Sequence, residues 1–171
     1  FIIISLLYWN YLNFKFLVNK SFFNLKNILI KLLFLLILFQ IIIGAFVSGL
    51  DAGMIYQTWP KMNHSYFPDD INIFEFNLFN FFDNQSFVQF LHRSVAYLII
   101  GFAIFIGIKT LTNKQEKYYK NYFIVLFILL IQVLLGIFTL ISGLNLYLAS
   151  LHQITSVILV FSVLKLNHKL S

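Results

Sequence analysis

The stretch IQVLLGIFTLISGL at residues 131–144 decides the fold, because it repeats the earlier stretch FQIIIGAFVSGL at residues 39–50. In each stretch a glutamine, Gln40 or Gln132, precedes a glycine by four positions, and each stretch ends in Ser-Gly-Leu. Each is followed by a second apolar stretch with Leu-His near its start. The chain therefore reads as two copies of one helical hairpin, with chance similarity between two apolar segments as the alternative.

Apolar residues dominate the 171-residue chain, which is 60% hydrophobic and 11% charged, with a mean hydropathy of +0.86. Five apolar stretches stand out, at residues 1–18, 28–50, 87–108, 122–144 and 146–166. A membrane-spanning helix needs roughly 20 apolar residues, so the last four stretches are long enough and the first is marginal. Because only internally hydrogen-bonded segments are stable in lipid, the sequence predicts an all-α integral membrane protein rather than a soluble helical core.

The stretches divide the chain into two parts. We expect residues 1–18 to be the end of a preceding transmembrane helix. Residues 28–166 are predicted to form a four-helix transmembrane bundle of two repeated hairpins, with an outer loop at residues 51–86. No basic leader or small-residue cleavage site accompanies the first stretch, which argues against a signal peptide.

Charge alternates along the chain with the predicted helices. The connections on one side carry most of the lysines: Lys15, Lys20, Lys26, Lys31, Lys109, Lys114, Lys117, Lys120, Lys165 and Lys169. The 51–86 loop is acidic, with Lys61 as its single lysine. By the positive-inside rule the lysine-rich side faces the cytoplasm or matrix, and the loop faces the periplasm or intermembrane space. The net charge of +6 is therefore explained by topology in a bacterial plasma membrane or mitochondrial inner membrane, and not by binding to nucleic acid.

Two histidines are predicted at one depth in the membrane. His92 lies about five residues into the third apolar stretch and His152 about six into the fifth, and both stretches run inward from the outer side. At 1.5 Å per residue, both imidazoles lie roughly 7–9 Å below the outer ends. Ionisable groups at membrane depth usually mark a function, although a lone membrane histidine is more often a packing residue.

The pair fits a haem iron better than other metals. In a square bundle with edges of roughly 8–10 Å, the diagonal is about 11–14 Å, which suits two imidazoles on one porphyrin iron if the third and fifth helices are diagonal. The chain has no cysteine, which excludes covalent c-type haem attachment and thiolate clusters. Zinc would need more ligands, and copper favours cysteine or methionine ligands that are absent or badly placed.

Other polar and small residues have competing interpretations. Arg93, the only arginine, is expected to pair with a haem propionate or to reach lipid headgroups. The small residues of the first repeat and the start of the loop, Gly44, Ala45, Ser48, Gly49, Ala52 and Gly53, are assigned to close helix packing. His64 and His168 are expected in solvent. The aromatic segment at 71–82 is expected to lie in the membrane interface, where it could cover the haem pocket.

Three ordered motifs resemble the haem A synthase family, in its proteobacterial and mitochondrial form. They are GAFVSGLDAGMIYQTWPKMN at 44–63, FVQFLHRSVAY at 87–97 and QVLLGIFTLISGLNLYLASLHQ at 132–153. The resemblance covers most of the chain and implies the C-terminal half of an eight-helix protein. It also implies that His92 and His152 bind a haem B. The implied activity is oxidation of the C8 methyl of haem O to the formyl of haem A, for cytochrome oxidase biogenesis.

The resemblance further implies partners and a division of labour. The N-terminal half of the family carries a second histidine pair and a glutamate proposed to act on haem O, so no catalytic residue is assigned in this chain. We expect either a truncated record or a separate chain that supplies that half, with haem O synthase or cytochrome oxidase assembly factors as further partners. Two alternatives remain: a b-type cytochrome subunit that transfers electrons without oxidation chemistry, and a structural or transport subunit whose histidines only pack.

Overall fold

The computed structural model describes residues 1–22, 27–71, 82–112 and 116–171, apart from the side chains of residues 116 and 117. The described part of the chain is helical and contains no strand. Its elements are α1 (Ile2–Lys15), α2 (Ile28–Gly49), the short 3-10 helix η1 (Ala52–Met54), α3 (Gln85–Thr112), α4 (Glu116–Ile141) and α5 (Leu146–Leu170).

Four of these helices, α2 to α5, are long and apolar enough to cross a membrane, with hydropathies of 1.7 to 3.0 in their most apolar windows. Helix α1, with 14 residues, is too short to cross a bilayer alone. The predicted all-α membrane fold with four full spans is therefore confirmed. The division into parts 1–18 and 28–166 stays a prediction.

Two helix ends differ from the sequence-based expectation for local reasons. Helix α3 begins at Gln85 rather than at residue 87, because the Asn84 side chain accepts a hydrogen bond from the backbone N–H of Phe87 (2.8 Å). Helix α4 ends at Ile141 rather than at residue 144, because the chain turns at Gly143 and Leu144, with φ of +72° and +62°. A left-handed residue after a helix is a common way to end it.

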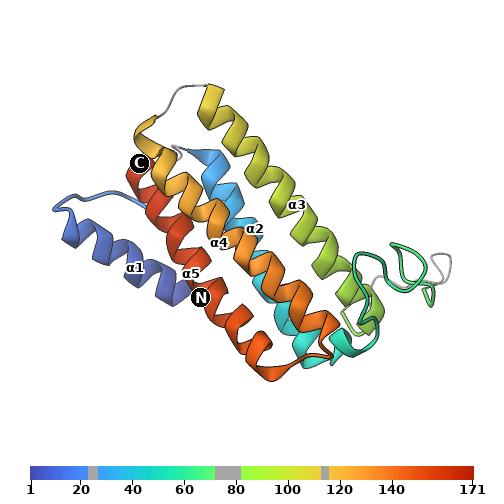
Figure 1. Cartoon of the computed structure of the whole chain (residues 1–171). Coiled ribbons are helices and arrows are strands. Elements are labelled where there is room, and N and C mark those ends of the chain that lie inside the picture. Colours follow the sequence, from blue (N-terminus) through green and yellow to red (C-terminus); the bar gives the residue numbers. More distant parts are fainter. Residues whose placement is uncertain (23–26, 72–81, 113–115) are drawn as a thin grey trace.

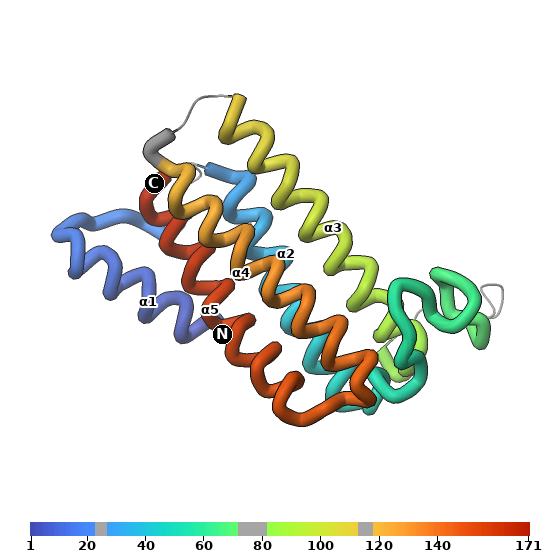
Figure 2. The backbone as a smooth tube through the Cα atoms, viewed as in Figure 1, coloured from blue at the N-terminus to red at the C-terminus, as the bar shows by residue number. Residues whose placement is uncertain are grey.

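The helices form a four-membered bundle with α1 packed on its outside (Figure 1). Helix α2 contacts α3 and α5, and α4 contacts the same two helices, so α3 and α5 lie on one diagonal of the bundle. Both α3 and α5 begin at the end of the bundle where the outer loop and the α4–α5 turn lie (Figure 2). The diagonal arrangement that a shared ligand requires is therefore present.

The core is a seam of fully buried aliphatic side chains between the helices, including Leu33, Ala103 and Val163. The outer faces are apolar too: on α4, Phe127 and Leu130 are 64% and 57% exposed. Apolar surface of this extent needs an apolar solvent, and the four spans indicate that lipid supplies it.

The two connections at the loop end of the bundle touch each other. A Cβ added at Gly53, in η1, would lie 2.9 Å from a methyl carbon of Leu144 in the α4–α5 turn. The 3-10 helix η1 thus meets Leu144, the last residue of the second Ser-Gly-Leu segment. Most of the aromatic segment 71–82, predicted for the interface, lies outside the described residues.

Candidate functional site

Each hairpin of the bundle holds a histidine against a glutamine by the same contacts. In the α2–α3 hairpin, Gln40 Nε2 donates to the backbone carbonyl of His92 (2.9 Å) and lies 3.3 Å from His92 Nε2. In the α4–α5 hairpin, Gln132 Nε2 donates to the carbonyl of His152 (3.0 Å) and lies 3.3 Å from His152 Nε2. The sequence repeat therefore corresponds to a repeated local geometry, and chance similarity does not account for it.

A glycine one turn after each glutamine makes room for the imidazole. A Cβ at Gly44 would lie 3.1 Å from His92 Cε1, and a Cβ at Gly136 would lie 3.0 Å from His152 Cε1. Carbon atoms in ordinary contact lie about 3.5–4.0 Å apart. Helix packing was the role expected for Gly44, and at both glycines the group that packs against the helix backbone is an imidazole of the neighbouring helix.

The contacts also define which ring nitrogen carries the proton. His152 Nδ1 lies 3.0 Å from the backbone oxygen of Gln132, which can only accept, so Nδ1 is the donor. The amide Nε2 of Gln132 can only donate, so His152 Nε2 carries the lone pair. Histidines that bind metals commonly donate their second ring N–H to a carbonyl in this way, which leaves the other nitrogen free for the metal.

The ring of His92 is held with fewer contacts. Gln40 Nε2 faces its Nε2 as in the other hairpin, so the lone pair is again on Nε2. Its Nδ1 is buried and has no hydrogen-bond partner within the described residues. The two sites thus share a tautomer but differ in how tightly the ring is anchored.

The two imidazoles lie at corresponding positions on diagonal helices. His92 is the eighth residue of α3 and His152 the seventh of α5, and these helices start at the same end of the bundle. Both side chains are partly buried.

The ligand set around the pair is small. In the ranges that the structure describes, no group of three or more histidine, aspartate or glutamate side chains could hold a metal ion. A metal bound by the two histidines would therefore need to bring its other ligands with it, as the iron of a porphyrin does. Two neutral imidazoles with Nε2 lone pairs fit that requirement.

Arg93 lies beside the site and holds the outer loop. Its Nη1 donates to the carbonyls of Thr58 (2.9 Å) and Lys61 (3.3 Å), and its Nη2 donates to the carbonyl of Tyr56 (2.8 Å). Its Nε is buried and has no partner among the described residues. Sequence reasoning did not anticipate the contacts with the loop, because the loop carbonyls carry no signal in the sequence.

A second anchor of the loop uses Asp70. Its carboxylate accepts from the Tyr56 hydroxyl and from Ser86 at the start of α3, both at 2.6 Å. Burial, and then the hydrogen bond to Asp70, raise the pKa of Tyr56. Burial also pushes the pKa of Asp70 upward, but the hydrogen bonds from Ser86 and Tyr56 together outweigh it, so the pKa lies below its ordinary value.

The remaining histidines differ in exposure. His64 is exposed, as expected. The expectation for His168 was wrong: it is 3% exposed, its Nε2 lies 2.9 Å from Asn13 Oδ1, and it packs edge-on against Trp9. Helix α1 covers this histidine, which the sequence could not indicate because the contact joins the two ends of the chain.

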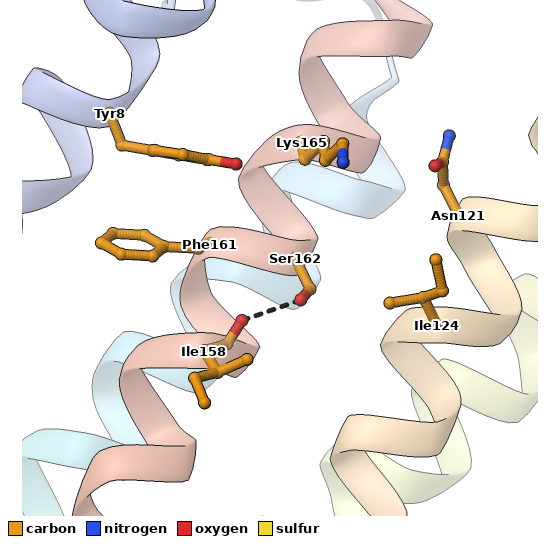
Figure 3. A pocket seen from close by; sticks show the side chains of 7 residues that line it. All are labelled: Tyr8, Asn121, Ile124, Ile158, Phe161, Ser162 and Lys165. Carbon is orange, nitrogen blue, oxygen red and sulfur yellow. Dashed lines mark hydrogen bonds between the residues drawn. The ribbon is translucent and has the colours of Figure 1, made fainter.

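A cavity of about 160 Å³ lies apart from the histidine pair, between α1, α4 and α5 (Figure 3). The ring of Tyr8 stacks on that of Phe161 at one side of it, with centroids 4.5 Å apart. Its lining contains neither His92 nor His152 and consists of Tyr8, Asn121, Ile124, Ile158, Phe161, Ser162 and Lys165.

Comparison with known proteins identifies relatives along almost the whole chain. A family model described as cytochrome oxidase assembly protein matches residues 1–164. A heme A synthase from Pelagibacter ubique is 39% identical over 168 residues, which are 98% of this chain and 49% of the relative. A heme A synthase from Rhizobium rhizogenes is 42% identical over 117 residues, 68% of this chain and 32% of the relative.

A further heme A synthase, from Wolbachia pipientis wMel, is 36% identical over 130 residues, 76% of this chain and 35% of the relative. The chain thus spans about half the length of the first of these relatives, and less of the others. No solved structure matches it. The chain therefore belongs to the cytochrome oxidase assembly protein family, and these relatives are heme A synthases.

Proposed function

We propose that His92 and His152 bind one haem iron between them, each through its Nε2 atom. The observation that carries this proposal is the repeated geometry of the two hairpins, which gives both imidazoles the same tautomer with the lone pair on Nε2. The diagonal position of α3 and α5 supports it, because the two histidines then come from opposite corners of the bundle and would hold one haem between them. A haem bound there would supply one-electron redox chemistry.

The neighbours of the two histidines fit the same role. The glycines next to the rings, Gly44 and Gly136, let each imidazole lie close against a helix. The buried Nε–H of Arg93, which lacks an acceptor among the described residues, is the group we propose for an anionic haem propionate. The other guanidinium nitrogens stay with the loop carbonyls, so Arg93 would join the loop to the site.

For the protein as a whole, we propose oxidation in haem A synthesis. The relatives are heme A synthases, and the motifs resemble the half of that family which holds a haem B. The substrate is proposed to be haem O, whose C8 methyl is oxidised to the formyl of haem A for cytochrome c oxidase. This chain would contribute the bis-histidine haem B site, and a part equivalent to the family's N-terminal half would contribute the site for haem O.

The proposed setting is a bacterial plasma membrane or mitochondrial inner membrane. The starts of α2 and α4 and the ends of α3 and α5 lie at the end of the bundle opposite the outer loop (Figure 1), and these helix ends carry Lys31, Lys109, Lys120, Lys165 and Lys169. The positive-inside rule then places the loop on the periplasmic or intermembrane side. Partners are proposed to be the lipid membrane, the N-terminal half, and haem O synthase or cytochrome oxidase assembly factors.

The ligand assignment is tested by His92→Ala and His152→Ala in the purified, membrane-inserted full chain. We expect the wild type to show the absorption and EPR spectra of low-spin, bis-imidazole haem, and we expect each variant to lose them while still inserting. His64→Ala is the matched control, because His64 is exposed and lies in the outer loop. A normal low-spin spectrum in both helix variants would contradict the proposal.

The enzyme proposal needs a second measurement, since a b-type cytochrome subunit would give the same spectrum. Haem O should be converted to haem A when the chain is produced together with the N-terminal half of a relative. His92→Ala should abolish this conversion, and His64→Ala should not. Bis-histidine haem with no conversion in any such pairing would favour a b-type cytochrome function.

A further inference from the structure

Resting on the proposed function, we propose that Gln40 and Gln132 are positioning residues for the two histidines. Before haem is bound, each side-chain amide contacts the Nε2 atom of its histidine. When the iron binds that histidine nitrogen, the contact with the amide is released. The step exchanges a hydrogen bond for an iron–nitrogen bond, and no covalent bond breaks. Glutamine thus prepares the ligand without competing strongly for it.

The two N–H bonds of each amide divide this task. One donates to the backbone carbonyl of the histidine, at 2.9 Å from Gln40 and 3.0 Å from Gln132. The other faces the ring nitrogen at 3.3 Å, which is beyond the usual range of about 2.7–3.2 Å for such hydrogen bonds. Loss of the longer contact leaves the amide hydrogen-bonded to the backbone carbonyl by the shorter one, so the glutamine stays attached to the histidine while the ring turns its Nε2 away from the amide.

The amide orientation is fixed by the same carbonyl. If either amide were reversed, its Oε1 would face the carbonyl oxygen of His92 or His152, and two acceptors would meet. In the observed orientation Oε1 of both glutamines is buried and has no hydrogen-bond partner among the described residues. Leaving a buried acceptor unpaired is unfavourable, so interaction with the histidine decides how the side chain lies.

The two hairpins differ in what remains when the amide is removed. His152 keeps the hydrogen bond from its Nδ1 to the backbone oxygen of Gln132. His92 has no corresponding contact at its buried Nδ1 within the described residues. Gln40 therefore determines the tautomer of His92, whereas the tautomer of His152 has a second determinant.

The inference is tested first without haem, by replacing each glutamine with methionine, which has similar length and no donor. The measurement is the ¹⁵N NMR spectrum of histidine-labelled, haem-free full chain in lipid. We expect Nδ1–H tautomers for both rings in the wild type, a mixture of tautomers for His92 in Gln40→Met, and an unchanged tautomer for His152 in Gln132→Met. An unchanged His92 tautomer in Gln40→Met would overturn the inference.

The second measurement is haem retention, with Gln153→Met as the control because Gln153 adjoins His152 but its side chain is exposed. Loss of a group that orients a metal ligand typically weakens metal binding by about 10–100-fold. We expect haem to leave Gln40→Met about tenfold faster than wild type, Gln132→Met to lose it less rapidly than that, and Gln153→Met to match wild type.

The outcomes separate this inference from the proposed function. If His92→Ala and His152→Ala keep their low-spin haem, the ligand assignment fails and the glutamine role fails with it. If the histidine variants lose haem but both glutamine variants retain it as Gln153→Met does, the ligand assignment stands and the positioning role is wrong. A purely structural glutamine would lower thermal stability without changing the His92 tautomer, and that result also contradicts the inference.

Discussion

Alanine at Gly44 or Gly136 is expected to displace the imidazole that lies on that glycine. The added Cβ would stand 3.1 Å from His92 Cε1 in Gly44→Ala and 3.0 Å from His152 Cε1 in Gly136→Ala. An ordinary carbon–carbon contact needs about 3.5 Å or more, so each ring must retreat by about 0.5 Å. The contact between glutamine Nε2 and ring Nε2, already 3.3 Å, then lengthens to about 3.8 Å and is lost.

The expected free-energy change combines two opposing effects. Forcing a methyl group into a packed site costs about 1–3 kcal/mol. Replacing glycine by alanine inside a helix stabilises it by about 1 kcal/mol. The net loss in stability is therefore about 0–2 kcal/mol, which leaves the bundle folded, while the geometry of the proposed ligand changes directly.

Gly101→Ala is the matched control, because Gly101 lies in α3 with His92 but nothing stands within 4 Å of an added Cβ. We expect Gly101→Ala to unfold at a slightly higher temperature and to bind haem as wild type does. Gly44→Ala and Gly136→Ala should lose haem about tenfold faster, as expected for a disturbed ligand environment. If all three variants retain haem equally, contact between glycine and imidazole does not matter for the site.

Two further predictions concern the outer loop. Burial acts to raise the pKa of Asp70 in the folded protein, but the hydrogen bonds from Ser86 and Tyr56 lower it more, so it lies below the ordinary value of 3.8. We therefore expect Asp70 to stabilise the folded loop above pH 3.8, and this stabilisation to be lost as the pH falls through the lower pKa of the folded state. The loss is measured as hydrogen exchange of the loop amides at a series of pH values. Asp70→Asn should show the same loss of protection at neutral pH. Equal protection of the wild-type loop at pH 3 and pH 7 would contradict the prediction. Arg93→Ala should destabilise the loop by about 2 kcal/mol, because it removes charge-assisted hydrogen bonds to three carbonyls; unchanged loop exchange would show that the guanidinium does not hold it.

Hydropathy along the chain predicted which segments cross the membrane. Helices α2, α3, α4 and α5 were each expected from an uninterrupted apolar stretch, because lipid contact imposes a length and a composition that can be read residue by residue. The ends were less accurate. The side chain of Asn84 starts α3 earlier, and the left-handed Gly143 and Leu144 end α4 sooner, through local hydrogen bonds that hydropathy does not report.

The repeat predicted the paired histidines but not what surrounds them. Gln40 and Gln132 were visible as part of the repeated pattern, yet their contact with the imidazoles depends on how two antiparallel helices rotate against each other. Because that rotation is set by packing along the whole hairpin, only the folded structure brings each amide within 3.3 Å of a ring nitrogen. The repeat thus identified both glutamines in the sequence, but it did not indicate that they contact the histidines.

The sequence by itself determined the number of spans, the alternation of charge and the similar distances of His92 and His152 from the starts of their helices, since these depend on positions along the chain. Tertiary structure decided the lateral order of the helices, which puts α3 and α5 on a diagonal, and the burial of His168 under α1. It also decided that Nη1 and Nη2 of Arg93 donate hydrogen bonds to carbonyls of the outer loop. These features join residues far apart in the chain. The same four spans can be arranged in several ways, and the arrangement is set by side-chain packing, which hydropathy does not report.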